Sequence, residues 1–161
     1  MRSVLFLVVC FLSTNYSIGQ ITFRDVDSTS IVNESDTYDS KFIESNKSNL
    51  DEFSNEDDAV IYVYRMKAIA GAAVKWQVVV SDRAETKLKN GEYFTVHIDT
   101  KQKFHYLEFP YIKFNYMNFE PNKYYAIGMK GFSVVASTGF LHKEDWNEIS
   151  KMSRNKIISV K

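Results

Sequence analysis

The chain has a single cysteine, Cys10, in 161 residues. One thiol cannot form an intrachain disulfide or a cysteine-rich metal site. Cys10 also lies in an apolar N-terminal stretch, so removal of that stretch would leave a chain without any thiol. Small eukaryotic secreted domains are usually held together by disulfides. An exported protein without them is more typical of a bacterial envelope.

Long hydrophobic runs are also lacking. The apolar stretch Val4 to Leu12 follows Arg2 and is less than half the length of about 20 residues that a membrane span needs. It is typical of a signal peptide, residues 1–19, cleaved after Gly19 so that the mature chain begins at Gln20. We expect no transmembrane segment and an exported protein, periplasmic or extracellular. The alternatives are a buried strand, or a lipid anchor on Cys10; the anchor is disfavoured because Cys10 lies inside the apolar stretch rather than at its end.

Catalytic and metal-binding motifs are missing as well. The run Gly131 to Val135 starts like a nucleophile elbow around Ser133 but lacks the closing glycine. The histidines do not have the spacing of zinc ligands; they are His97, His105 and His142. Four acids could still meet in space as a catalytic carboxylate pair: Glu92, Asp99, Glu108 and Glu120. Nothing in their spacing requires it, so we expect no enzyme, no metal and no cofactor.

Charge divides the rest of the chain into two parts. Residues 20–58 hold eleven acidic and three basic residues, a formal charge of −8, whereas residues 59–161 carry +7. The acidic part has few large apolar side chains and predicts a flexible leader. It either folds back on the basic domain or serves as a solubilising tether. Nucleic acid is not an expected partner, because the signal peptide removes the protein from it and the lysines are scattered.

The basic part, residues 59–161, reads as a mainly β domain, an antiparallel β-sandwich or a flattened barrel of about seven strands. Its strand-like segments are rich in β-branched and aromatic residues. These segments are 59–66, 73–81, 92–98, 104–109, 112–119, 124–130 and 132–137.

Turns and one helix complete the expected fold. Asn90-Gly91 predicts a type I′ hairpin turn that sets Lys89 opposite Glu92. Pro121-Asn122 predicts a second turn. The period then changes, because Trp146, Ile149 and Met152 fall three residues apart and predict an amphipathic helix from Lys143 to Ser153 that packs against the sheet.

Three short motifs carry a family resemblance. Ala59 to Arg65 (AVIYVYR), Leu88 to Phe94 (LKNGEYF) and Phe119 to Tyr125 (FEPNKYY) resemble the Tyr-Arg, Asn-Gly-x-Tyr-Phe and Lys-Tyr-Tyr motifs of a family of uncharacterised bacterial envelope domains. The resemblance covers about residues 58–152. It implies an exported protein, often a lipoprotein, with a β-sandwich and no assigned activity. The chain departs from the family pattern at Thr100 to His105, where a Pro-Gly turn is absent, and at Asn122, where glycine is usual.

Aromatic and basic side chains give the candidate binding site. Tyrosine and phenylalanine crowd residues 106–125, and alternation along strands sends about half of them outward unless they fill the core. We expect Arg65, Tyr111, Lys113 and Tyr116 to form a surface that binds an envelope protein or a glycan. Arg65 could equally pair with an acid such as Glu108. The favoured function is a non-catalytic binding or structural accessory module; the alternative is a carboxylate-dependent enzyme acting on an envelope polysaccharide.

Overall fold

The structure is a computed structural model that describes most of the chain beyond residue 36. The described residues are 37–69, 72–81, 84–102, 107–110, 112–114, 118–130 and 134–160. The predicted signal peptide and residues 20–36 of the predicted leader lie outside them.

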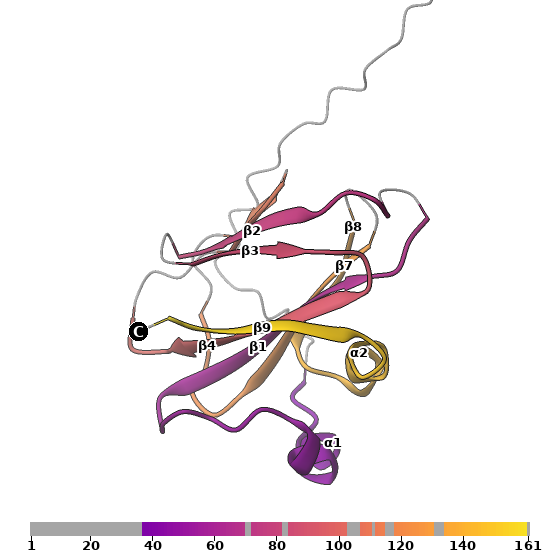
Figure 1. The fold of residues 1–161 in the computed structure, drawn as a ribbon. Coiled ribbons are helices and arrows are strands. Elements are labelled where there is room, and N and C mark those ends of the chain that lie inside the picture. Colours follow the sequence, from indigo (N-terminus) through magenta and orange to yellow (C-terminus); the bar gives the residue numbers. More distant parts are fainter. Residues whose placement is uncertain are drawn as a thin grey trace, which may run out of the picture.

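Strands dominate the described residues and form two sheets. The larger sheet has the order β8-β7-β1-β4-β9. Its strands are β1 (Asp58–Met66), β4 (Glu92–Asp99), β7 (Tyr124–Lys130), β8 (Val134–Phe140) and β9 (Ser153–Val160). The smaller sheet has the order β3-β2-β5-β6. Its strands are β2 (Trp76–Val80), β3 (Ala84–Leu88), β5 (Leu107–Phe109) and β6 (Ile112–Phe114). In Figure 1, β2 and β3 lie on one side of the larger sheet and α1 (Ser40–Asn46) on the other.

The expected mainly β class, the two-sheet arrangement and the short helix near the C-terminus are confirmed, and the sheets do not close into a barrel. Among the described strand pairs, β1–β7 and β4–β9 are parallel and the others antiparallel. Two strands were not expected. β3 is rich in charge, and β9 follows α2 (Lys143–Ile149), which ends before the predicted Ser153. Parallel pairing with β4 draws these last residues into the sheet.

The Asn90-Gly91 turn differs from its prediction. Lys89 and Glu92 do form an ion pair at 3.4 Å, but β3 and β4 belong to different sheets, so the turn joins two sheets rather than a hairpin. Gly91 has a φ of +76°, whereas Asn90 is not among the residues with positive φ, which excludes type I′ geometry. The turn at Pro121-Asn122 is confirmed, with Asn122 at a φ of +57°.

The larger sheet packs on both faces. Its inner face faces the smaller sheet through an apolar cluster that includes Ile61, Phe94, Ile127 and Trp76. Its outer face carries a second cluster, in which tyrosines pack against α1 and α2. One close approach there requires glycine: a Cβ at Gly128 would lie 2.3 Å from the end of the Tyr64 ring.

The segment 37–58 is folded, which contradicts the expectation of a flexible leader for these residues. Asp39 begins α1 by accepting a hydrogen bond from the Phe42 backbone N–H at 3.0 Å. A short 3-10 helix, η1 (Lys47–Asn49), follows. Phe42, Ile43 and Leu50 are buried in the outer cluster. We call residues 37–58 the covering segment, because they lie over the outer face of the larger sheet.

Candidate functional site

Four tyrosines line the outer face of the larger sheet beneath the helices. Tyr62 and Tyr64 come from β1, Tyr93 from β4 and Tyr124 from β7, and each is at most 9 % exposed. Alternation places them there, because their neighbours Ile61, Val63, Phe94 and Tyr125 belong to the inner cluster. On this face the tyrosines are therefore covered and do not form an open platform.

The tyrosine hydroxyls hold the covering structure in place. The Asp51 N–H donates to the Tyr62 hydroxyl at 2.8 Å, and the Tyr124 hydroxyl donates to the Asp51 carbonyl at 2.8 Å. The Tyr64 hydroxyl donates to Asp145, which lies in the first turn of α2, at 2.7 Å. Burial raises the pKa of Tyr62 and Tyr64 above the usual tyrosine range and that of Tyr124 to about 12. These hydroxyls are therefore neutral hydrogen-bonding anchors at physiological pH.

The Asp51 carboxylate is the charged centre of this network. Arg154 contacts both of its oxygens, at 3.0 and 3.1 Å, and the Thr95 hydroxyl donates to it at 3.0 Å. Burial lowers the pKa of Arg154, but its hydrogen bond to Tyr93 and the charge of Asp51 outweigh burial and raise it. This two-point contact connects the acidic covering segment to β9 of the basic domain. Of the two alternatives for the acidic part, folding back on the basic domain describes residues 37–58.

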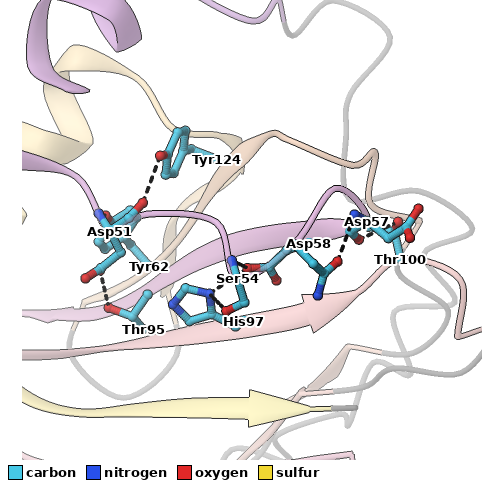
Figure 2. A network of polar contacts seen from close by, with 10 residues as sticks. Asp51, Ser54, Asp57, Asp58, Tyr62, Thr95, His97, Thr100 and Tyr124 are labelled. Atoms are coloured by element: carbon cyan, nitrogen blue, oxygen red, sulfur yellow. Dashed lines mark hydrogen bonds and ion pairs between the residues drawn. The ribbon is translucent and has the colours of Figure 1, made fainter. Parts of the chain in front are cut away.

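Ser54, His97 and Asp58 resemble a catalytic triad in composition but not in geometry. Figure 2 shows the three side chains together: Ser54 and Asp58 belong to the covering segment, and His97 lies on β4 below it. The Ser54 hydroxyl and the Asp58 carboxylate both contact Nδ1 of His97, at 3.2 and 2.7 Å. A triad needs the serine on one ring nitrogen and the acid on the other. Asp58 also accepts a hydrogen bond from the Ser54 N–H, so the cluster fixes the covering segment to β4.

Two open clefts flank α1. The first, of about 440 Å³, lies between α1 and α2, and we call it the α1–α2 cleft. Its lining consists of Asp39, Lys41, Phe42, Ser45, Asn46, Lys143, Trp146 and Asn147. The second, of about 640 Å³, we call the Glu44–Glu52 cleft. Its lining consists of Glu44, Ser45, Lys47, Ser48, Glu52, Phe53 and Tyr124.

Arg65 is not a surface residue, contrary to its place in the predicted binding site. Its side chain is 1 % exposed and lies 4.5 Å above the Trp76 ring. The guanidinium donates to the carbonyls of Val74 at 2.5 Å and Leu88 at 3.3 Å. Arg65 shares the inward side of β1 with Ile61 and Val63, so its long side chain reaches towards the smaller sheet, and burial lowers its pKa. These contacts fit the alternative expectation, in which Arg65 has a structural role, and the acceptors described here are backbone carbonyls.

Of the other three predicted site residues, only the backbone of Lys113 lies in the described part of the chain. Tyr111 and Tyr116 lie outside the described residues, as do His105 and Ser133. The backbone of Lys113 lies in β6 opposite Glu108, and its side chain is outside the described part of the chain.

Sequence reasoning missed the covering segment and with it Asp51 and the two clefts. A signal was present, because Asp39-Ser40 is a helix-starting pair followed by the apolar residues Phe42 and Ile43. His97 lies in a strand, as expected, but beneath this segment rather than at an open surface. Within the described residues no group of three side chains is arranged to hold a metal ion, and no helix is long and apolar enough to cross a membrane.

Comparisons with known proteins add no relative. Neither the scan of family models nor the searches of curated proteins and solved structures found a match to this chain. The resemblance to bacterial envelope domains therefore stays a prediction that rests on its three motifs.

Proposed function

We propose that the protein is a non-catalytic, exported binding module of the bacterial envelope that takes an acidic glycan in the α1–α2 cleft. The observation that carries this proposal is the position of Trp146, a half-buried indole in an open cleft whose lining residues are mostly of polar types. Envelope proteins remain the alternative class of partner.

Trp146 is suited to contact a sugar ring. Its indole is fixed from beneath by an edge-on contact with Tyr62, with ring centroids 5.5 Å apart. A fixed aromatic ring offers a large contact area at little cost in conformational entropy. Around it the cleft carries the amides of Asn46 and Asn147. The Asn46 amide nitrogen already donates to the Phe42 carbonyl and the Ser45 hydroxyl, so Asn46 offers its amide oxygen as an acceptor. The Asn147 amide has both donors and an acceptor, as sugar hydroxyls require.

Two lysines give the cleft its preference for an anion. Lys41 and Lys143 are exposed, and neither forms an ion pair with another described residue. The one acid in the lining, Asp39, already caps α1 through the Phe42 N–H. A carboxylate or sulfate on the sugar would therefore meet two unpaired ammonium groups.

The test is a binding titration by calorimetry with an acidic polysaccharide, polygalacturonate, against neutral dextran. We expect binding to polygalacturonate that weakens as salt is added. Trp146→Ala should weaken it about tenfold or more, as for an aromatic residue central to a site. Lys41→Ala with Lys143→Ala should abolish its salt dependence. Lys87→Ala, which removes an exposed lysine of β3 on the other side of the larger sheet from α1, is the matched control and should bind as the parent does. Equal affinity in the Trp146 variant would exclude this site.

The exported location is tested separately. Mass spectrometry of the protein recovered from an envelope fraction should give a mature chain that begins at Gln20. A lipid on Cys10 would replace the proposed soluble form with an anchored one. Recovery of the intact chain from the cytoplasm would contradict export.

An enzyme acting on an envelope polysaccharide remains the alternative, and the Glu44–Glu52 cleft is the feature that favours it. Both glutamates line this cleft beside Phe53, which lies 4.6 Å from the Tyr124 ring. Glycosidases use such a pair of carboxylates. The Glu44→Gln and Glu52→Gln variants separate the two functions, because loss of polysaccharide cleavage in both would establish the enzyme. Binding without release of reducing ends by the parent protein supports the binding module.

A further inference from the structure

The loop between β1 and β2 is apolar, and most of its described residues are exposed. Its sequence, residues 67–75, is KAIAGAAVK, in which seven residues without a polar side chain stand between two lysines. Residues 70 and 71 lie outside the described part. Ile69 is 99 % exposed and Val74 is 47 % exposed, and Ala72 and Ala73 are exposed as well. Exposed apolar side chains gathered in one loop mark a contact surface more often than scattered ones do.

The base of this loop is held by specific hydrogen bonds. The Asn90 side chain bonds both backbone groups of Ala68, each at 3.0 Å. Arg65 donates to the carbonyl of Val74 on the other side of the loop. The Ala72 N–H donates to the Ile69 carbonyl at 3.3 Å, which makes a turn near the tip. Ile69 therefore projects from an anchored base instead of folding onto the core.

Lysines surround the apolar residues. Lys67 and Lys75 flank them directly, and the Lys67 stem lies over Gly91, where an added Cβ would be 2.7 Å from its Cε. Lys130 lies at the same end of the sheet, because it is the partner of Met66 in the β1–β7 pair. All three lysines are exposed, and none forms an ion pair with another described residue.

We propose that the described residues of this loop dock the protein on an anionic lipid surface, with Ile69 inserted among the acyl chains and Lys67, Lys75 and Lys130 at the headgroups. Apolar area drives such binding, and lysines next to it add attraction to anionic lipids. The neighbours of Ile69 in sequence have small side chains, so we expect insertion only into the interfacial region of the lipid layer and not into its centre. A protein pocket would also accept Ile69, but lysines on both sides of the loop and at the end of β7 favour a broad negative surface.

The experiment is co-sedimentation of the full chain with vesicles. One set contains phosphatidylcholine mixed with phosphatidylglycerol, and the other contains phosphatidylcholine alone. We expect sedimentation with the first set, much less with the second, and a decrease as salt is added. Ile69→Asp should reduce the partition coefficient about tenfold or more, because a charge enters the apolar interface. Lys67→Gln with Lys75→Gln should remove most of the difference between the two sets.

A matched control and a depth measurement keep the result specific. Ile157→Asp changes another exposed isoleucine, 52 % exposed on β9, and should bind as the parent does. Thermal unfolding should show the same midpoint for the parent and the Ile69 variant, since Ile69 makes no buried contact. In Ile69→Trp, lipids brominated on their acyl chains should quench the added fluorescence. Unchanged binding by Ile69→Asp, or absence of this quenching, would overturn the proposal. Failure of the parent to bind either vesicle would overturn it too and leave a protein partner as the loop's target.

Discussion

The two faces of the larger sheet are made from the same strands but are covered by different chemistry. The inner face meets the smaller sheet through aliphatic and aromatic side chains. The outer face meets the covering segment and α2 through tyrosines whose rings pack and whose hydroxyls bond to acids and backbone. The inner contact is non-directional, whereas the outer contact is built from directional bonds between specific partners.

Removal of the covering segment should cause the largest loss of stability, because it uncovers the outer face and leaves the inner face packed. A chain that begins at Asn55 loses Phe42, Ile43 and Leu50 from the outer cluster and exposes the tyrosines beneath them. Burial of three apolar side chains contributes about 5 kcal/mol, so most of the stability of a small domain should be lost. Urea unfolding measured against a chain that begins at Thr37 tests this. Coincident transitions would restore the sequence-based view that these residues are dispensable for folding.

Two neighbouring residues of β4, Tyr93 and Phe94, allow the stability contributed by the two faces to be compared within one strand. Phe94 points inward and is fully buried, whereas Tyr93 points outward and is 9 % exposed. Phe94→Ala should lower the free energy of unfolding by about 4 kcal/mol, through lost burial and a cavity. Tyr93→Ala should lower it by about 2 kcal/mol, because the Arg154 hydrogen bond is lost but the site is near solvent. Chemical denaturation of both variants checks the order, and equal losses would mean that the faces do not differ.

Asp51 and Asp57 separate a network contact from a surface contact. The Asp51 side chain is 11 % exposed and held by two partners, whereas the Asp57 side chain is 36 % exposed and pairs with Lys101. Asp51→Ala should cost about 2 kcal/mol, between the values typical of buried and exposed ion pairs. It should also open residues 37–58 to proteases while the rest of the domain stays protected. Asp57→Ala, the control, should cost under about 1 kcal/mol. If both variants are cleaved equally, Asp51 does not hold the segment.

Alkaline titration probes the outer face without a mutation. Tyr62, Tyr64 and Tyr124 have pKa values raised by burial, so the folded state disfavours their ionisation. For a group whose folded pKa lies above its unfolded value, this stability is present below the unfolded pKa and lost as the pH rises. The loss should begin near the usual tyrosine value of 10 and continue beyond about 12, the pKa of Tyr124. Absorbance of tyrosinate should therefore show a late step that coincides with unfolding. A single step near pH 10 with the fold intact would contradict the buried anchors.

Local patterns were sufficient for most elements of the fold. β1 and β4 could be predicted from dense β-branched and aromatic runs, and the start of α2 from its three-residue spacing and its acidic first turn. The turn at Pro121-Asn122 followed from proline, which fixes φ before the bend, and Asn122 adopts a positive φ there. β3 could not be predicted in this way, because its charged residues are not typical of a strand. It forms a strand because it pairs with β2 at the edge of the smaller sheet.

The candidate site depended almost entirely on tertiary contacts. Arg65 was predicted as a binding residue because a guanidinium at the end of a strand can bind an anion. In the fold, its side chain points towards the smaller sheet, so the guanidinium lies between the two sheets over the Trp76 ring. Trp146 was expected as a core residue of α2, and its place beside Lys41 exists because α1 docks next to it. Composition cannot show such contacts, since they join residues of different elements that only the fold brings together.

The sequence by itself determined the class of the fold, since the alternation that makes a strand two-faced is local and repeats every two residues. It also determined the opposite charges of the two parts of the chain. Only the tertiary structure decided that the acidic residues near Asp51 fold onto the sheet. The apolar contacts of this segment come from three side chains, Phe42, Ile43 and Leu50, which are too few for the sequence to indicate a core. Its polar contacts come from the hydroxyls of Tyr62 and Tyr124, which lie on different strands and bond to the Asp51 backbone.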